Sequence, residues 1–442
     1  MSRVLRRVFA LAVLLIIVLT LRSVEPLEIP GASTALTLGI LLLSAYIGGQ
    51  VAKLVGLSRV TGYIAIGLVL GPSGLEFLTD GDVNSLQPFS SVAIALIAIT
   101  AGGELSLERL RGAGRYLASI TLIQSATVMV FVFGGVIALS SFLPFTTGRD
   151  LPVVLTVAMV FASVAVASSP SVAIAVITDT ESAGPVSTSI LGVTVLKDVL
   201  VIILFAGALT VSYAVLEPGQ PGQSSLAIDL AREIGGSIAM GAFFGALIGG
   251  YLRWINEHLV VFTIALAWIL VEVAASLHLE LLLMALTAGF TLELLNPKQG
   301  DAFVTALEAA SLPLYALFFS LAGAAVHLAE LAAVWQWAIL FVLLRIAGLW
   351  VGTIIGARVG GAPPAVRRHA WPGFISQAGV ALGMATLVAR EFPSWGADLQ
   401  GFFVGLVAIH ELIGPIAAKW TLDRAGETGR APSRAGVSGL AH

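Results

Sequence analysis

Cysteine is absent from this chain of 442 residues, and charged residues are scarce. Without a thiol, the chain has no disulfide, no thiolate metal ligand and no cysteine nucleophile. Only 11% of the residues are charged and 57% are hydrophobic, whereas a soluble domain carries about 25% charged residues. With a mean hydropathy of +0.98, the composition excludes a soluble domain and predicts an all-α polytopic membrane protein.

Several motifs of enzymes and binding proteins are also absent. The chain has no phosphate-binding glycine loop and no basic nucleic-acid patch, so we expect no nucleic-acid partner. His410 and Glu411 begin like a zinc-binding HExxH helix, but Gly414 stands where the second histidine would be. The sequence GPSG at 71–74 is not a nucleophile elbow. The sequence therefore favours a protein that is not an enzyme and predicts no cofactor.

Long apolar runs predict about 13–14 transmembrane helices. Their expected positions are 4–22, 34–54, 59–76, 88–105, 113–140, 151–177, 184–213, 227–252, 257–276, 279–296, 302–327, 333–357, 365–390 and 396–420. Residues 1–33 resemble a signal peptide without a small-residue cleavage site, which favours a retained extra helix or signal anchor. We expect one transmembrane domain over 34–427 and a disordered, cytoplasmic tail over 428–442.

The lysines and arginines predict the orientation of these helices. Most of the 23 basic residues fall in segments on the side of the N-terminus. Basic residues on the opposite side are few, namely Arg22, Arg149, Arg232 and Arg390. Because cytoplasmic loops are enriched in Lys and Arg, both termini are predicted to be cytoplasmic in a multi-pass protein of the cell (inner) membrane.

The spans form two similar sets. Six spans at 34–213 and six at 257–420 flank one linking helix at 227–252, which gives the halves opposite topology and predicts an inverted repeat. The fifth span of each half is interrupted, by Pro170 within ASVAVASSPSVAIAV and by glycines within WPGFISQAGVALGMA. Each break alone could be an ordinary kink. Together they predict two broken, crossing helices around a polar cavity, whose polar residues are Ser168, Ser169, Pro170, Ser171, Ser376 and Gln377.

Three charged residues lie far from the ends of their spans. Lys197 and Asp198 are adjacent within LGVTVLKDVLVIILFAG, and Arg345 lies within VLLRIAGLW. A charge at the bilayer centre costs at least about 2.5–3.5 kcal/mol, so such residues point to a transport site. An aspartate that exchanges between a proton, a cation and a fixed arginine would be a minimal antiport device. The alternative is a permanent Asp–Arg bridge that holds the helices together.

Other ionisable residues are secondary candidates. Four glutamates lie nearer to span ends, where the side chain can reach the interface; they are Glu104, Glu272, Glu280 and Glu308. We favour Glu272 among them as a cavity residue, and we expect Glu272 or Glu308 to hold a charged Lys197. His410 and Glu411 form a polar pair in the sixth span of the second half, matching Lys197–Asp198 in the first.

Six segments between residues 34 and 427 carry a family resemblance in their order along the chain. They are VTGYIAIGLVLGPSGL (60–75), ITAGGELSLERL (99–110), SSPSVAIAVI (168–177), LGVTVLKDVLVI (191–202), LLRIAGLWVGTIIGARVG (343–360) and HELIGPIAAKWTLDRAGE (410–427). Together they resemble the monovalent cation:proton antiporter superfamily, which includes bacterial sodium/proton antiporters and potassium-efflux proteins.

The resemblance implies a scaffold or dimer domain that moves against a core domain carrying the broken helices. It implies that Asp198 binds the transported cation, most simply Na⁺, and titrates, with Arg345 as its internal partner. This chain departs from the family at two places: Lys197 replaces a second Asp, an Asn or a Gln, and Gln377-Ala378-Gly379 replaces Arg-Gly-Glu. The first change favours exchange of one cation for one proton. A carrier of anionic solutes on the same scaffold, or a non-transporting or channel-like relative, remains an alternative.

Glycines recur at every fourth residue in two spans, at 241, 245 and 249 and at 348, 352, 356 and 360. Such ladders put small residues on one helix face. They indicate close helix packing, either inside one chain or between the two copies of a predicted homodimer.

Overall fold

The computed structural model contains helices and no strand in the residues that it describes, which confirms the predicted all-α class. It describes Val13 and residues 32–104, 107–216, 223–255, 258–326, 328–377 and 379–430. Apart from Val13, the predicted helix at 4–22 lies outside these residues. The elements are α2 (Ala32–Leu54), α3 (Arg59–Leu70), α4 (Asp80–Glu104), α5 (Leu107–Ala138), α6 (Leu151–Ala165), α7 (Pro170–Asp179), α8 (Pro185–Leu216), α9 (Gln223–Trp254), α10 (Leu259–Leu277), α11 (Leu281–Leu295), α12 (Pro297–Ala324), α13 (Leu328–Val359), α14 (Pro364–His369), the 3₁₀ helix η1 (Trp371–Phe374), α15 (Gly379–Glu391) and α16 (Gly396–Ala425).

The helices match the predicted spans between residues 34 and 420. Most spans contain one helix. The first interrupted span contains α6 and α7, and the second contains α14, η1 and α15. By length and composition, eight helical stretches of the described residues could cross a membrane. Four further apolar helices are shorter, at 59–70, 261–277, 281–295 and 313–324. The chain is therefore a multi-pass membrane protein.

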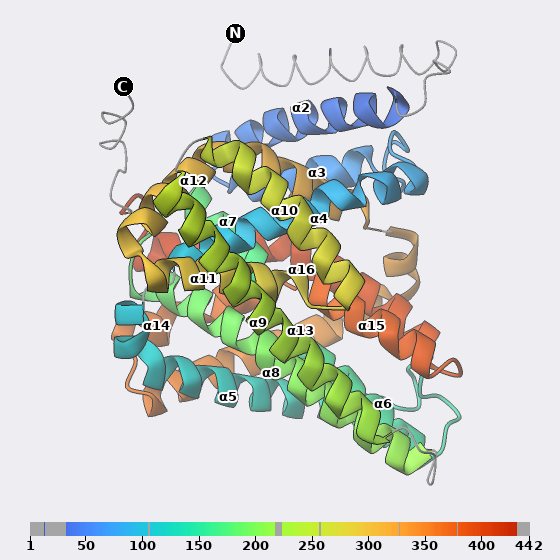
Figure 1. The fold of residues 1–442 in the computed structure, drawn as a ribbon. Helices are drawn as coiled ribbons and strands as arrows, with labels where there is room; N and C mark the ends of the chain where they lie inside the picture. The colour runs from blue at the N-terminus through green and yellow to red at the C-terminus, as the bar shows by residue number, and fades with distance from the viewer. Residues whose placement is uncertain are drawn as a thin grey trace.

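The helices pack into two groups (Figure 1). The scaffold bundle consists of α2, α3, α4, α9, α10, α11 and α12, and the site bundle consists of α5, α6, α7, α8, α13, α14, η1, α15 and α16. In Figure 1, α2, α3 and α4 lie in the upper part of the view and α5 lies in the lower part. The bundles meet mainly where α3 and α4 contact α7, where α3 contacts α16, and where α8 contacts α9.

Both glycine ladders are used for packing inside the chain. A Cβ atom on Gly352 of α13 would lie 2.4 Å from the Cα of Gln124 on α5, and one on Gly245 of α9 would lie 2.4 Å from the carbonyl oxygen of Ala288 on α11. Such short separations mean that only glycine lets these helix backbones approach so closely. These two faces are therefore occupied by neighbouring helices of the same chain, and the homodimer stays a prediction.

The N-terminus of α8, the helix with the buried charges, is capped by a residue far away in the sequence. Pro185 has no backbone N–H and Gly184 has no side chain, so the helix start cannot cap itself. The Glu427 carboxylate accepts hydrogen bonds from the amides of Val186 and Ser187, both at 2.7 Å, and from the Ser187 hydroxyl at 2.8 Å. A Cβ on Gly184 would lie 2.4 Å from the Glu427 carboxyl carbon, so glycine makes this approach possible.

The residues after α16 continue this attachment. The amide of Gly429 donates to the carbonyl of Thr180 at 3.0 Å, and the hydroxyl of Thr428 donates to Asp423 at 2.7 Å. The first residues of the predicted disordered tail are thus hydrogen-bonded to α16 and to the loop between α7 and α8. Residues 431–442 of that tail lie outside the described residues.

We expect Glu427→Ala to lower the free energy of unfolding by about 2–4 kcal/mol, because it removes three charge-assisted hydrogen bonds from a helix N-terminus. Glu427→Gln keeps an oxygen acceptor but loses the charge, so its effect should be smaller. Thermal unfolding of the purified protein in detergent measures both. A melting temperature of Glu427→Ala equal to that of wild type would contradict the capping role.

Candidate functional site

Both interrupted spans are broken at the predicted places, and the two breaks touch. The first break separates α6 from α7, and the second separates η1 from α15. The amide of Ser169 donates to the carbonyl of Ser376 at 2.9 Å, and the Ser168 hydroxyl donates to the carbonyl of Phe374 at 3.0 Å. Ser169 also caps α7 by accepting a hydrogen bond from the amide of Val172 at 3.3 Å. We call these contacting unwound segments, 166–169 and 375–377, the crossing.

Pro170 explains the first break. It occupies the first position of α7, where a missing N–H costs nothing, and it disfavours helical geometry in the residue before it. The crossing leaves backbone carbonyls at the end of α6 and of η1 without helical partners. Helix C-termini carry partial negative charge, so these ends need a positive partner inside the protein.

Arg345 provides that positive partner. Its Nε donates to the carbonyl of Ala165 at 2.8 Å, one terminal nitrogen donates to Ala167 at 2.5 Å, and the other donates to Ile375 at 2.7 Å. The side chain is only 2% exposed. The planar guanidinium can satisfy several carbonyls at once, so it fastens the two broken helices to each other.

This arrangement corrects the predicted role of Arg345. We expected it to be the internal partner of Asp198. Within the described residues, no hydrogen bond or ion pair joins Arg345 to Asp198, because the carbonyls of the crossing occupy its donors. The permanent Asp–Arg bridge, the alternative that the sequence left open, is likewise not formed in this conformation.

Lys197 also binds the crossing, and no carboxylate among the described residues pairs with it. Its side chain is fully buried, and the ammonium donates to the Ser168 hydroxyl at 3.1 Å and lies 5.9 Å from the centre of the Phe374 ring. Glu272, one of the two expected partners, is exposed on α10 and does not reach this position. The side chain of Glu308, the other expected partner, lies outside the described residues.

Asp198 is the least satisfied group of the site. It is 7% exposed, and neither carboxylate oxygen has a hydrogen-bond partner in the part of the chain that the structure describes. The hydroxyl of Ser376 and the Nε2 of His410 are also buried and have no hydrogen-bond partner within the described residues. The Nδ1 of His410 lies 2.8 Å from the carbonyl oxygen of Leu406. A buried, unpaired carboxylate is stable only when it is protonated or holds a cation. Asp198 therefore lacks, within the described residues, the partner that a buried carboxylate needs.

A cavity of about 640 Å³ lies between the two bundles and reaches the crossing. Residues 167–171 form part of its wall, and the ionisable residues in the wall are Glu233, Glu280 and Glu411, with no lysine or arginine among the described lining residues. Asp198 is not among the described lining residues, but Ile202, one turn further along α8, lines the cavity. An acidic wall of this kind favours cations over anions.

The glutamates differ in how they match the expectations. Glu411 lines the cavity, as its place in the sixth span of the second half allows. Glu280 also lines it and caps α11 by accepting from the amides of Leu282, at 3.2 Å, and Leu283. From the sequence, we ranked Glu280 behind Glu272 as a cavity residue. The signal for its role was the N-cap position directly before the apolar run 281–295, since that helix is short and starts inside the protein. The side chain of Glu104 lies outside the described residues.

The sequence of this chain also matches a known protein family. The sequence model of the family described as "Sodium/hydrogen exchanger, transmembrane" matches residues 39–424. No curated protein sequence matches the chain.

Solved structures of the sodium proton antiporter MjNhaP1 from Methanocaldococcus jannaschii share the fold. One, determined at pH 8, superposes with a TM-score of 0.68 at 16% sequence identity and covers 89% of this chain and 98% of its own. Another, an electron-microscopy map, gives a TM-score of 0.71 at 16% identity and covers 88% of this chain and 97% of its own. At this identity the likeness concerns the fold alone.

Proposed function

The chain belongs to the sodium/hydrogen exchanger family, and on this basis we propose that it exchanges sodium ions for protons by alternating access. Membership of this transporter family supports cation/proton antiport and a function other than that of an enzyme. In the proposed cycle, the ionised Asp198 binds the cation from one side of the membrane and releases it to the other side when a proton replaces it. Ser168–Ser171, Ser376 and Gln377 would complete the coordination of the cation.

The observation that carries this proposal is the distribution of charge around the cavity. The ionisable side chains that line it are glutamates, whereas Lys197 and Arg345 are turned to the Ser168 hydroxyl and the carbonyls of the crossing. A carrier of anionic solutes would need cationic groups in the wall, so the cation carrier is the better match.

Alternating access is supported by the division into two bundles. The crossing and Asp198 both belong to the site bundle, and the cavity separates that bundle from the scaffold bundle. A rigid-body shift of the site bundle would carry the cation past the scaffold bundle without unfolding either one.

We extend the proposal to the remaining features that the sequence predicts. They are a homodimer in the cell (inner) membrane, both termini in the cytoplasm, and inverted repeats at 34–213 and 257–420 joined by the helix 227–252. The bias of lysine and arginine supports this orientation.

The proposed function is tested with purified protein in liposomes that contain a pH-sensitive dye. Adding sodium outside should move protons in the opposite direction, with saturation, and choline at equal ionic strength should not. Potassium and lithium, tested in the same way, establish the selectivity. Proton movement driven by anionic solutes, or ion conduction without proton movement, would replace the proposal by an anion carrier or by a channel.

A further inference from the structure

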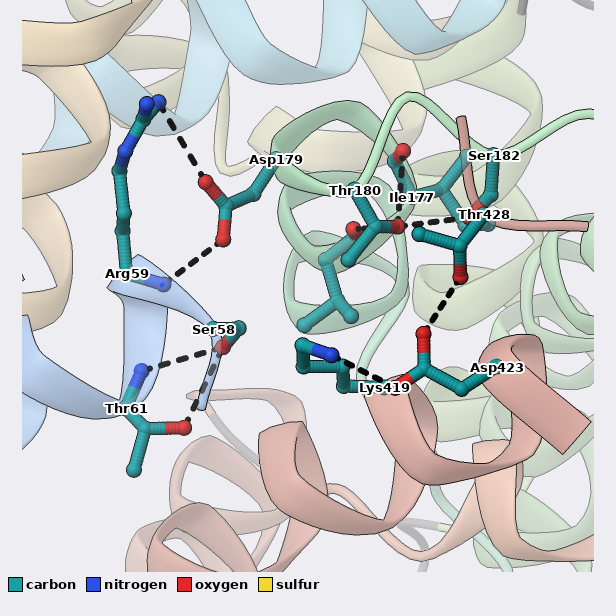
Figure 2. Close-up of polar contacts among 11 residues, drawn as sticks. Ser58, Arg59, Thr61, Ile177, Asp179, Thr180, Ser182, Lys419, Asp423 and Thr428 are labelled. Carbon is teal, nitrogen blue, oxygen red and sulfur yellow. Dashed lines mark hydrogen bonds and ion pairs between the residues drawn. The ribbon is translucent and has the colours of Figure 1, made fainter. Parts of the chain in front are cut away.

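An ion pair joins the two bundles at the end of α7, the second half of the first broken span. Arg59 is the first residue of α3 in the scaffold bundle, and Asp179 is the last residue of α7 in the site bundle. One oxygen of Asp179 accepts from the backbone amide of Arg59 at 2.7 Å, and the other lies 3.4 Å from the Arg59 guanidinium (Figure 2). The Asp179 carboxylate thus binds both the backbone amide at the start of α3 and the Arg59 side chain.

The pair lies at the opposite end of the bundle interface from the cavity. α7 starts at Pro170 in the cavity wall and reaches Asp179 after ten residues, a distance of about 15 Å. α3 runs in the opposite direction, from the level of the ion pair to the level of the cavity. After its C-terminal end, the Ser73 hydroxyl donates at 2.7 Å to the carbonyl of Val326, which lines the cavity.

The ends of three helices meet around this pair. Figure 2 shows the start of α3, the end of α7 and the end of α16 in one view, and each of these helices contacts the other two. Val60, the neighbour of Arg59, is 1% exposed, and Asp179 is itself only 10% exposed. The bundles are therefore closed against each other here, while the cavity separates them at the other end.

We infer that the Arg59–Asp179 pair is the contact that closes the transport path on the side away from the cavity. It stabilises the present conformation and must separate before Asp198 can face that side. This inference rests on the proposed alternating-access cycle and assigns two residues to it that act by positioning the bundles and not by touching the cation.

A second ion pair close by supplies the matched control. Lys419 donates to Asp423 at 2.6 Å within one face of α16, and Figure 2 shows it beside the first pair. Both of its residues belong to a single helix, so the pair does not connect the bundles. Lys419→Ala removes one positive charge, as Arg59→Gln does, without releasing the contact between α3 and α7.

The test uses the absence of cysteine, which makes any introduced thiol the sole reactive one. Val380, a half-buried residue of the cavity wall, is replaced by cysteine as a reporter. A membrane-impermeant thiol reagent is applied to right-side-out and to inverted membrane vesicles, without a cation gradient. The reporter alone should react from the side to which the cavity opens.

Asp179→Asn added to the reporter should raise labelling from the opposite side by roughly fivefold, the change in equilibrium that loss of about 1 kcal/mol produces. Arg59→Gln should act in the same direction, and Lys419→Ala should leave both sides unchanged. Labelling from the cavity side shows that each variant is folded.

Unchanged sidedness in both Asp179→Asn and Arg59→Gln would overturn the inference, as would an equal shift in Lys419→Ala. The labelling needs no transported ion, so its outcome is separate from that of the liposome assay. The labelling experiment therefore tests the closing contact even in a protein that does not exchange sodium for protons.

Discussion

Asp198→Asn is expected to reduce sodium-driven proton movement to the level of protein-free liposomes. Asparagine has the shape of aspartate but neither its charge nor its titration, so one residue change removes both the cation ligand and the proton carrier. Because neither oxygen of Asp198 has a hydrogen-bond partner in the described part of the chain, no native hydrogen bond of that carboxylate is lost. The new amide donor should cost at most about 1–3 kcal/mol of stability. The variant should therefore fold and be inactive.

Glu272→Gln is the matched control for this prediction. It removes a carboxylate from a membrane helix of the same protein, but Glu272 is exposed on α10 and does not line the cavity. Exchange should continue at the wild-type rate in this variant. Both proteins are compared in liposomes at equal density, with thermal unfolding as the measure of folding. Robust exchange in Asp198→Asn would exclude Asp198 as the transport group.

The class of the protein and its two broken helices followed from the sequence for simple physical reasons. Apolar runs long enough for a bilayer leave few alternatives to membrane helices, and a proline among serines inside such a run rarely continues a helix. Charges in the middle of spans are too costly to be accidental, so Asp198 and Arg345 could be selected before their surroundings were known.

The partners of those charges could not be predicted in the same way. Arg345 binds backbone carbonyls, and backbone carbonyls are present at every residue, so the sequence carries no sign of which ones are free. Lys197 binds a serine hydroxyl, a group that occurs in many spans. Carboxylates stood out as candidate partners because charged side chains are rare in the spans of a membrane protein.

The cap at Glu427 was missed for a related reason. Its position just after the last helix, before a stretch rich in glycine, arginine and serine, indicated the start of a disordered tail. The glutamate folds back over the loop between α7 and α8 because Gly184 and Pro185 leave the start of α8 without a cap of its own. That need is visible in the sequence of α8, but the residue that meets it is more than two hundred positions away.

Arg345→Ala is expected to lower the free energy of unfolding by about 3–5 kcal/mol and to abolish exchange. It removes charge-assisted hydrogen bonds to Ala165, Ala167 and Ile375 and leaves these buried carbonyls at helix C-termini without a donor. Arg345→Lys keeps the charge but cannot reach several carbonyls with one planar group, so an intermediate loss is expected. Arg358→Ala, an exposed position on the same helix, should change stability by less than about 0.5 kcal/mol.

A double-mutant cycle separates this role from a direct pairing of Arg345 with Asp198. If Arg345 were held by Asp198, the Arg345→Ala variant would leave a buried carboxylate unpaired, and adding Asp198→Asn would restore much of the lost stability. If Arg345 holds the carbonyls of the crossing, Asp198→Asn removes none of the groups that Arg345→Ala leaves unpaired. The losses in the free energy of unfolding caused by the two changes then add. Thermal unfolding of wild type, both single variants and the double variant therefore decides between the two roles. We expect additivity to within about 0.5 kcal/mol, because the groups that lose their partner in Arg345→Ala belong to the backbone of the broken helices.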